Sequence, residues 1–425
     1  MNIRLSEIEG LLNQRKIKAA EVKITRALRT TNPVQLQSAL LLLRARAKLL
    51  TSRPEGGLED ISRAALLFPD IMMQPGAQEL QADCFFARYE LSALGFAERS
   101  DWANAERVYT HLLAQFPNYE NYGWVLYQFG RLLLSGSQVE RAVDYFQRAL
   151  MKPSHITALT SYAYERLGFT AFYEQRDFRQ ALIYLEKAIQ TYPSSADGAW
   201  LIHAHLLNGR VLRDMHRIDE SVKSANIALK LANRRGLARA SVLEALLTAA
   251  EIFSRADGQE QRVIEVLAQY FQLSKRPPGI DVTWSRAYEM LGDACFSTGL
   301  YERAVTAYLA VLQYNPYHPW EISIYLRVAR AYYQQGLYET AAQAVQRAIN
   351  SANAEDQIVD FQAYDLLGSA YYAMGQFDKA IRGFDMALTL IHANDPSIAK
   401  ITQYRQFAVD AIKQNPIPLQ DSKLK

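Results

Sequence analysis

The stretch that decides the fold runs from Tyr288 to Pro316 and reads YEMLGDACFSTGLYERAVTAYLAVLQYNP. A small residue, Gly292, is followed twelve positions later by a second small residue, Ala304, and four positions after that by the bulky Tyr308. Small residues on the facing sides of two antiparallel helices let the backbones approach, and the bulky ring fills the remaining space. The spacing therefore predicts an antiparallel helix pair that ends at Pro316, since proline cannot continue a helix interior.

The same pattern returns through most of the chain, at intervals of 37 to 41 residues with two exceptions of 48 and 83. The interval of 83 predicts one degenerate copy within residues 238–274. Helical periodicity dominates and no alternating strand of convincing length occurs, so we predict an all-α chain in which each repeat buries its apolar face against its neighbours. We use the first small residue of each repeat as its landmark. The landmarks are Ala45, Ala93, Gly130, Gly168, Gly209, Gly292, Ala329 and Gly368.

Three irregularities interrupt the period. The interval of 48 predicts an enlarged loop at residues 70–82, around Pro75 and Gly76. The repeat at 161–193 carries one extra residue near position 176, so that its second small residue is Ala181. The strongest helix breaker is the segment KRPPGID at residues 275–281, because consecutive prolines and a glycine do not fit inside a helix.

The breaker sets the predicted organisation of the chain. We expect an N-terminal array over residues 1–274, a linker at 275–281 and a C-terminal array over 282–414, with a simple long turn at 275–281 as the alternative. Residues 394–414 are predicted to form a capping helix and residues 415–425 a flexible tail. The N-terminal repeats are placed near residues 1–33, 34–70, 83–118, 122–154, 158–194, 198–235 and 238–274.

The order of small, aromatic, Gly, Ala, aromatic, Ala and Pro positions at fixed offsets resembles the tetratricopeptide repeat family, in an extended form of about 37–41 residues. The resemblance implies a right-handed superhelical α-solenoid of stacked antiparallel helix pairs, with about ten repeats and a C-terminal capping helix. It also implies a concave groove lined by the first helices of the repeats, which build binding surfaces rather than reaction centres.

Composition narrows the class of partner. The chain holds 47 Lys and Arg against 44 Asp and Glu, a formal charge of +3, which is too even to make nucleic acid the expected ligand. Residues 1–50 nevertheless contain ten Lys and Arg against three Glu. This basic end is either a solvated cap or a docking face for an acidic protein or anionic surface.

Cysteine usage and hydropathy indicate the compartment. Cys84 and Cys295 lie in separate repeats without paired spacing, as expected of reduced core residues. The N-terminus lacks the apolar core of a signal peptide, and the most apolar stretch, residues 39–50, is interrupted by three basic residues. We therefore expect no membrane span and a cytoplasmic location.

No constellation of reactive side chains indicates an enzyme. The sequence lacks a phosphate-binding glycine loop, and His203 and His205, two positions apart, fall on different sides of a helix. Neither cysteine has the context of an activated nucleophile. We expect no catalytic residues, no cofactor and no metal site.

The groove positions carry the most informative side chains. The residue directly after the landmark is arginine in four repeats, and arginine offers a planar set of donors suited to carboxylates and phosphates. The expected ligand is an extended or helical peptide with acidic groups; the alternative is that the arginines are solvated or pair with groove carboxylates such as Glu165, Asp214, Glu289 and Asp293. The candidate groove residues are Arg46, Trp124, Tyr127, Arg131, Tyr162, Arg166, Arg210, Arg213, Arg327, Arg330, Tyr333 and Tyr372.

These observations favour a non-catalytic scaffold or adaptor that binds another protein through this groove. A regulatory sensor of a small peptide or metabolite, in signalling or transcription control, is the alternative, and RNA binding is disfavoured by the near-zero net charge. The sequence is also compatible with self-association of the array.

Overall fold

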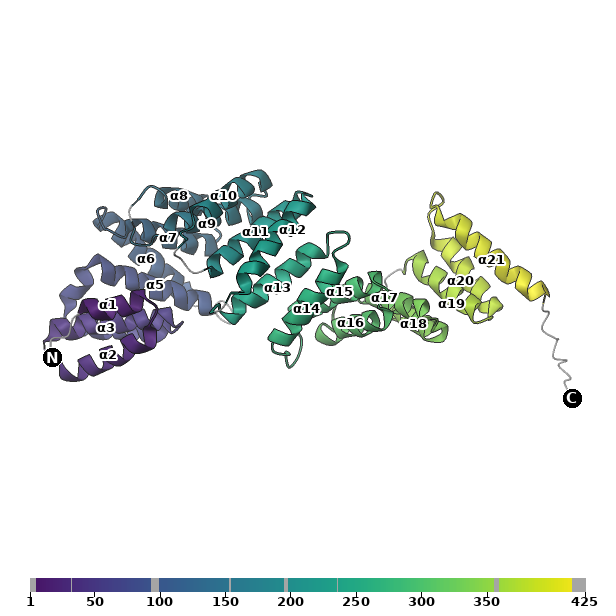
Figure 1. The fold of residues 1–425 in the computed structure, drawn as a ribbon, viewed down its shortest axis with the longest axis horizontal. Helices are drawn as coiled ribbons and strands as arrows, with labels where there is room; N and C mark the ends of the chain where they lie inside the picture. Colours follow the sequence, from purple (N-terminus) through teal and green to yellow (C-terminus); the bar gives the residue numbers. More distant parts are fainter. Residues whose placement is uncertain are drawn as a thin grey trace. The chain divides into compact units, whose positions relative to one another are not determined.

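The chain divides into two compact units, unit 1 from Met1 to Asp197 and unit 2 from Gly198 to Lys425 (Figure 1). The structure, a computed structural model, describes residues 5–31, 33–92, 99–152, 154–194, 198–234, 236–354 and 359–414, and of Arg99, Asn353 and Ala354 the backbone only. Throughout these described residues the regular structure is helical, as the sequence predicted. No helix among them combines the length and apolar composition needed to cross a bilayer.

Unit 1 contains five helix pairs, and its helices follow one another along the chain as hairpins (Figure 1). The pairs are α1 (Leu5–Asn13) with α2 (Ile17–Thr30), α3 (Val34–Leu50) with α4 (Pro54–Leu67), α5 (Pro75–Ser92) with α6 (Arg99–Gln115), α7 (Tyr122–Ser135) with α8 (Val139–Ala149), and α9 (Leu159–Tyr173) with α10 (Phe178–Thr191).

Unit 2 adds five further pairs and a final single helix, so the predicted ten repeats and capping helix are confirmed over the described residues. The pairs are α11 (Ala199–Asp214) with α12 (Ile218–Ala232), α13 (Arg239–Phe253) with α14 (Glu260–Leu273), α15 (Val282–Ser297) with α16 (Tyr301–Tyr314), α17 (Glu321–Gln334) with α18 (Tyr338–Ala354), and α19 (Phe361–Ala373) with α20 (Phe377–Leu390); α21 (Ser397–Gln414) follows.

Close packing at the landmarks explains the repeated spacing. A Cβ atom on Gly292 would lie 2.5 Å from the ring of Tyr308, and one on Gly368 would lie 2.7 Å from the ring of Phe384. Both distances are far below van der Waals contact, so only glycine lets the two helices of these pairs approach this closely. The sixteen-residue offset between landmark and ring is thus a packing requirement of the hairpin.

Short turns join the two helices of most pairs, and a glycine recurs at the same place in three of these turns. Gly299, Gly336 and Gly375 each occupy the middle of a three-residue connection with φ between 71° and 77°, a left-handed conformation that glycine adopts without steric cost. The connection from α9 to α10 has four residues, 174–177, which confirms the predicted one-residue insertion.

The predicted enlarged loop at residues 70–82 is wrong. A 3-10 helix, η1 (Pro69–Met73), is followed at once by α5, which begins at Pro75. Proline is tolerated in the first helical turn, where its missing N–H has no intrahelical partner, so Pro75 starts a helix instead of preventing one.

The landmark of this repeat is also corrected by the structure. The hydroxyl of Tyr308 donates to Asp293, the residue after landmark Gly292, at 2.8 Å. The hydroxyl of Tyr109 donates in the same way to Asp83, at 2.5 Å, which makes the fully buried Ala82 the structural landmark. Ala93, the landmark inferred from the sequence, lies outside the described residues. The extra residues of this repeat therefore lie after the landmark in the chain, not before it.

The degenerate repeat predicted within residues 238–274 is the pair α13 and α14. Its landmark is the buried Ala250, 41 residues after Gly209 and 42 before Gly292. The residue after this landmark is Glu251, where other repeats have arginine.

The breaker at residues 275–281 lies inside unit 2, between α14 and α15. One hydrophobic core runs through unit 2 from Ala225 to Ala370 and includes Leu267 and Trp284 on either side of the breaker. The boundary between the compact units falls at Asp197 and Gly198 instead. The separation of two arrays by a linker at 275–281 stays a prediction.

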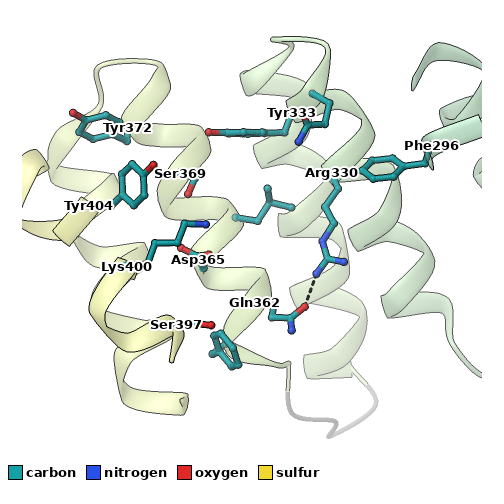
Figure 2. A pocket seen from close by; sticks show the side chains of 13 residues that line it. Phe296, Arg330, Tyr333, Gln362, Asp365, Ser369, Tyr372, Ser397, Lys400 and Tyr404 are labelled. Atoms are coloured by element: carbon teal, nitrogen blue, oxygen red, sulfur yellow. Dashed lines mark hydrogen bonds between the residues drawn. The ribbon is translucent and has the colours of Figure 1, made fainter. Parts of the chain in front are cut away.

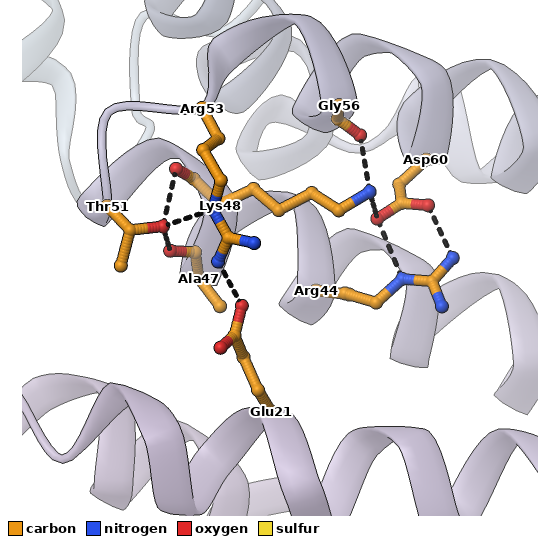
Figure 3. A network of polar contacts seen from close by, with 8 residues as sticks. All are labelled: Glu21, Arg44, Ala47, Lys48, Thr51, Arg53, Gly56 and Asp60. Carbon is orange, nitrogen blue, oxygen red and sulfur yellow. Dashed lines mark hydrogen bonds and ion pairs between the residues drawn. The ribbon is translucent and has the colours of Figure 1, made fainter.

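Part of the N-terminal basic charge is used inside unit 1, where Asp60 of α4 is buried between two cations of α3 (Figure 3). Arg44 donates to both carboxylate oxygens of Asp60, at 2.8 and 2.5 Å, and the Lys48 ammonium lies 2.8 Å from Oδ2. These cations hold the pKa of Asp60 below its ordinary value although burial opposes them. Arg44 and Lys48 are therefore structural, since they compensate a buried charge.

The final helix α21 closes the end of unit 2. Ile401 and Ala408 are fully buried and share a core with Ala380 and Phe384 of α20. Its opposite face is polar and exposed, with Thr402, Gln403 and Gln406. This amphipathic division confirms the predicted cap, although the helix begins at Ser397 instead of 394. The predicted flexible tail at 415–425 lies outside the described residues.

Candidate functional site

The position after the landmark varies in charge among the first helices of the repeats. The sequence has arginine there in four repeats; besides Asp293 on α15, already recognised as a groove carboxylate, acidic residues also stand at this position on α5 and α13. The sequence-based prediction missed Asp83 and Glu251 because the landmarks Ala82 and Ala250 had not been recognised. In chain order the position is occupied by Arg46, Asp83, Arg131, Phe169, Arg210, Glu251, Asp293, Arg330 and Ser369.

In unit 1 the predicted arginines bond within the array. Arg131 donates to Glu90 at 2.6 Å and to Gln128 at 3.0 Å, and its guanidinium lies over the ring of Phe86. Arg166 forms an ion pair of 2.8 Å with the buried Glu165. Arg46 is exposed and donates to a neutral partner, the side-chain oxygen of Asn13, at 2.9 Å. Arg46 is thus the least compensated predicted cation of this unit.

The predicted aromatic residues of unit 1 lie together on α7 and α9. The ring of Tyr127 lies 5.2 Å from that of Trp124 and 6.2 Å from that of Tyr162, measured between centroids. Trp124 and Tyr162 are partly exposed, but only 6% of Tyr127 is accessible. Tyr127 therefore belongs to the core of unit 1, whereas its two neighbours lie at its surface.

Two carboxyl groups that the sequence had not singled out stand one turn apart on α5. Glu79 accepts from the hydroxyl of Tyr119 at 2.7 Å and from the amide of Asn121 at 2.8 Å. Burial, together with the charge of Asp83, raises the pKa of Glu79 to about 7, and burial raises the pKa of Asp83 to about 6. Glu79 thus holds the connection between α6 and α7, whereas Asp83 accepts from Tyr109 of α6.

Unit 2 contains a cavity of about 960 Å³, which we call the central cavity, on α11, α13, α15 and α17. Its arginines face carboxylates: Arg327 lies 3.0 Å from both Glu289 and Asp293, and Arg286 lies 3.3 Å from Glu251. The lining holds four arginines against six carboxylates, so the cavity favours no acidic ligand. Of the predicted residues, Arg213 and Arg327 line it, and Arg210 lies beside it, 3.5 Å from Glu251.

A second hollow of unit 2, the C-terminal pocket, brings three predicted residues together: Arg330, Tyr333 and Tyr372 (Figure 2). It has a volume of about 390 Å³ and is lined by α17, α19 and α21. Arg330 donates to the neutral amide oxygen of Gln362, and the ammonium of Lys400 lies 5.9 Å from the ring centre of Tyr404. Among the described residues, neither cation of this pocket forms an ion pair.

Asp365 lies in the middle of the C-terminal pocket, between the two cations (Figure 2). Its Oδ1 atom is buried and accepts no hydrogen bond from the described residues. Burial raises the pKa of Asp365, although the charges of Lys400 and Arg330 oppose that shift. The pocket therefore offers an acceptor that needs a donor and two cations that need acceptors.

Some residues of this pocket could have been found from the sequence. Gln362, Asp365, Ser369 and Tyr372 lie six and three before landmark Gly368 and one and four after it, along the predicted groove stripe. Lys400 and Tyr404 belong to the capping helix, which has no landmark, so repeat spacing does not identify them. Among the described residues, no three metal-ligating side chains gather at a common site.

Models of the tetratricopeptide repeat match three segments of the sequence, residues 162–195, 285–318 and 363–396. Each segment is one helix pair of the structure: α9 with α10, α15 with α16, and α19 with α20. The chain is built from tetratricopeptide repeats. Such repeats generally mediate protein–protein interactions and are typically non-catalytic scaffolds.

Several solved structures are similar to this chain at low sequence identity. The C-terminal part of a tetratricopeptide repeat protein from Cytophaga hutchinsonii is 16% identical, with 65% of this chain and 98% of that one covered and a TM-score of 0.46. A tetratricopeptide repeat protein from Parabacteroides merdae is 13% identical, with 68% and 98% covered and a TM-score of 0.40. PilF of Pseudomonas aeruginosa is 14% identical, with 57% and 94% covered and a TM-score of 0.42. No curated protein sequence matches this chain significantly.

Proposed function

We propose that this tetratricopeptide repeat protein is a non-catalytic scaffold that binds an acidic segment of another protein in the C-terminal pocket of unit 2. The proposal depends on which cations of unit 2 form ion pairs with carboxylates and which do not. Arg330 and Lys400 line an open pocket beside three tyrosines and, within the described residues, form no ion pair; the carboxyl group near them, Asp365, has a pKa raised by burial. In the central cavity, in contrast, Arg213, Arg286 and Arg327 form ion pairs with carboxylates.

The chemistry of the pocket fits a peptide in particular. Every residue of an extended peptide presents a backbone N–H and a carbonyl, so one ligand supplies both the donor that Asp365 lacks and acceptors for the two cations. A glutamate or aspartate side chain is the strongest acceptor for Arg330. The rings of Tyr333, Tyr372 and Tyr404 add contact area at low entropic cost.

A second candidate function is the sensing of a small peptide or metabolite. The volume of the C-terminal pocket, about 390 Å³, is within the range of small-molecule sites, about 300–1,000 Å³. A metabolite would fill the pocket without extending along the neighbouring helices. The two functions therefore differ in the length of ligand that reaches full affinity.

Selection of short displayed peptides on the full chain tests the proposal. We expect enrichment of peptides with Asp or Glu, and Arg330→Glu should weaken a selected peptide by about tenfold, measured by fluorescence anisotropy. The matched control is Arg382→Glu, an exposed arginine of α20 outside the pocket. If both variants bind the peptide equally well, the C-terminal pocket is not the binding site. If peptides shortened to one or two residues keep full affinity, the sensing function is favoured over the scaffold function.

A further inference from the structure

Unit 2 exposes large apolar side chains on two consecutive inter-repeat connections. Ile280 and Val282, before and at the start of α15, are 61% and 65% exposed. Tyr317 and Trp320, in the connection from α16 to α17, are 85% and 67% exposed. Four such residues on neighbouring connections form a patch, which we call the apolar edge, and exposed apolar patches commonly mark interaction sites.

The first connection of the apolar edge contacts the end of α16, from which the second connection starts. The backbone N–H of Asp281 donates to the carbonyl of Tyr314 at 2.8 Å, three residues before Tyr317. A hollow of about 520 Å³ lies between the first connection and the end of α16, lined by residues 276–280 with Gln313 and Tyr314. Protruding rings and a hollow therefore belong to the same continuous surface.

Charges of both signs flank this surface. Lys275 and Arg276 are exposed at the start of the first connection, and Glu321 follows Trp320 at the start of α17. Among the described residues, none of the three forms an ion pair. A two-fold axis brings one surface against itself, so that a cation of one copy meets an anion of the other and a protrusion meets a hollow.

We propose that the apolar edge binds a second copy of this chain, with Trp320 of each copy in the hollow of the other. A stable interface needs about 800 Å² from each partner, and each large aromatic residue supplies about 150–250 Å² when it is fully buried. Tyr317 and Trp320 thus provide a substantial part of the required area, and the apolar residues beside them extend it. Aromatic residues at the centre of an interface usually dominate its affinity.

The first test is the mass of the full chain in solution, measured by light scattering and sedimentation velocity over a concentration series. We expect a dimer of the 48.2 kDa chain. Trp320→Glu should weaken dimerisation at least about 30-fold, because the residue occurs twice in a two-fold interface. Tyr317→Ser is the second variant, since a residue that is 85% exposed can be replaced without loss of fold. The control is Leu66→Glu in unit 1, where the side chain is 84% exposed.

Cross-linking locates the contact. Both native cysteines, Cys84 and Cys295, are buried, so Tyr317→Cys introduces an accessible thiol. We expect an oxidant to link two chains through this residue but not through Leu66→Cys. A wild-type chain that stays monomeric at every concentration would overturn the proposal, and so would a dimer that Leu66→Glu weakens as much as Trp320→Glu does. Sedimentation of such a monomer with phosphatidylserine vesicles would assign the edge to a lipid surface instead.

Discussion

The central cavity and the C-terminal pocket lie in the same unit and are lined by equivalent positions of the repeat, yet their arginines have different partners. In the central cavity Arg327 is held by Glu289 and Asp293 of the preceding first helix. In the C-terminal pocket Arg330, three residues further along the same helix, bonds to a neutral amide of the following one. The charge that an arginine keeps at these positions is therefore set by the facing residue of the adjacent repeat, because a paired arginine has little charge left for a ligand.

The largest expected effect is on peptide binding. Arg330→Glu combined with Lys400→Glu reverses both cations of the C-terminal pocket and should weaken an acidic peptide selected on the wild-type chain by at least about 30-fold. Arg286→Glu, in the central cavity, should change the affinity less than about twofold, because that region is already acidic. Titration calorimetry measures both. Similar losses in the two regions would contradict the distinction between them.

Removal of an arginine should affect stability in the opposite order. Arg327→Met leaves Glu289 and Asp293 without their cation and should lower stability by about 1 kcal/mol, because Asp293 is partly desolvated and its pKa is already raised by burial. Arg330→Met removes a bond to a neutral amide and a through-space attraction for Asp365, and should cost less than about 0.5 kcal/mol. Urea midpoints of the full chain provide the comparison. If Arg330→Met costs as much as Arg327→Met, Arg330 is structural.

Placing a carboxylate in the C-terminal pocket should make it resemble the central cavity. Gln362→Glu gives Arg330 a charged partner within the chain, so we expect about fivefold weaker binding of an acidic peptide. Gln362→Met is the matched control, which removes the amide without adding charge and should not weaken binding. Fluorescence anisotropy distinguishes the two variants. Unchanged affinity of Gln362→Glu would mean that Arg330 does not contact the ligand.

The smallest effect concerns Asp365 and pH. Its pKa is raised in the folded chain, so the native state holds a proton that the unfolded state has already released, and stability falls as pH rises from the ordinary Asp value of about 4 through the raised value. Asp365→Asn removes this term and should gain stability relative to the wild type over that window, by less than about 1 kcal/mol. Melting temperatures at several pH values measure the gain. A gain that does not depend on pH would show that desolvation of the charge is not its cause.

The fold followed from sequence where steric spacing alone decides it. Gly292 with Tyr308 and Gly368 with Phe384 keep the same offset because a Cβ atom at the glycine would collide with the ring. The prediction failed at residues 70–82, because proline ends a helix or starts one depending on its place in the turn, and the sequence does not show which.

The sequence predicted only part of the candidate site, again because it does not show the structural surroundings of each residue. The spacing predicted one helix face for these positions, since side chains three and four residues apart share a face, and Arg330, Tyr333 and Tyr372 line one pocket. It did not identify Lys400 and Tyr404, which come from a helix without repeat landmarks. It also left open which arginines meet carboxylates of another repeat, because contacts such as Arg327 with Asp293 and Arg131 with Glu90 join side chains 34 and 41 residues apart in the chain.

By itself, the sequence determined the all-α repeat architecture and the residues that share one face of each first helix, because both depend on local periodicity and on the size of residues within one hairpin. Only the tertiary structure decided which cations on that face are available. Arg327 and Arg330 have the same chemistry and occupy neighbouring turns of α17. Arg327 is paired with a carboxylate of the preceding repeat, whereas Arg330 lines a pocket that α21 completes. Coulomb interactions act through space, so the free charge of a groove is a property of stacked repeats and not of any single one.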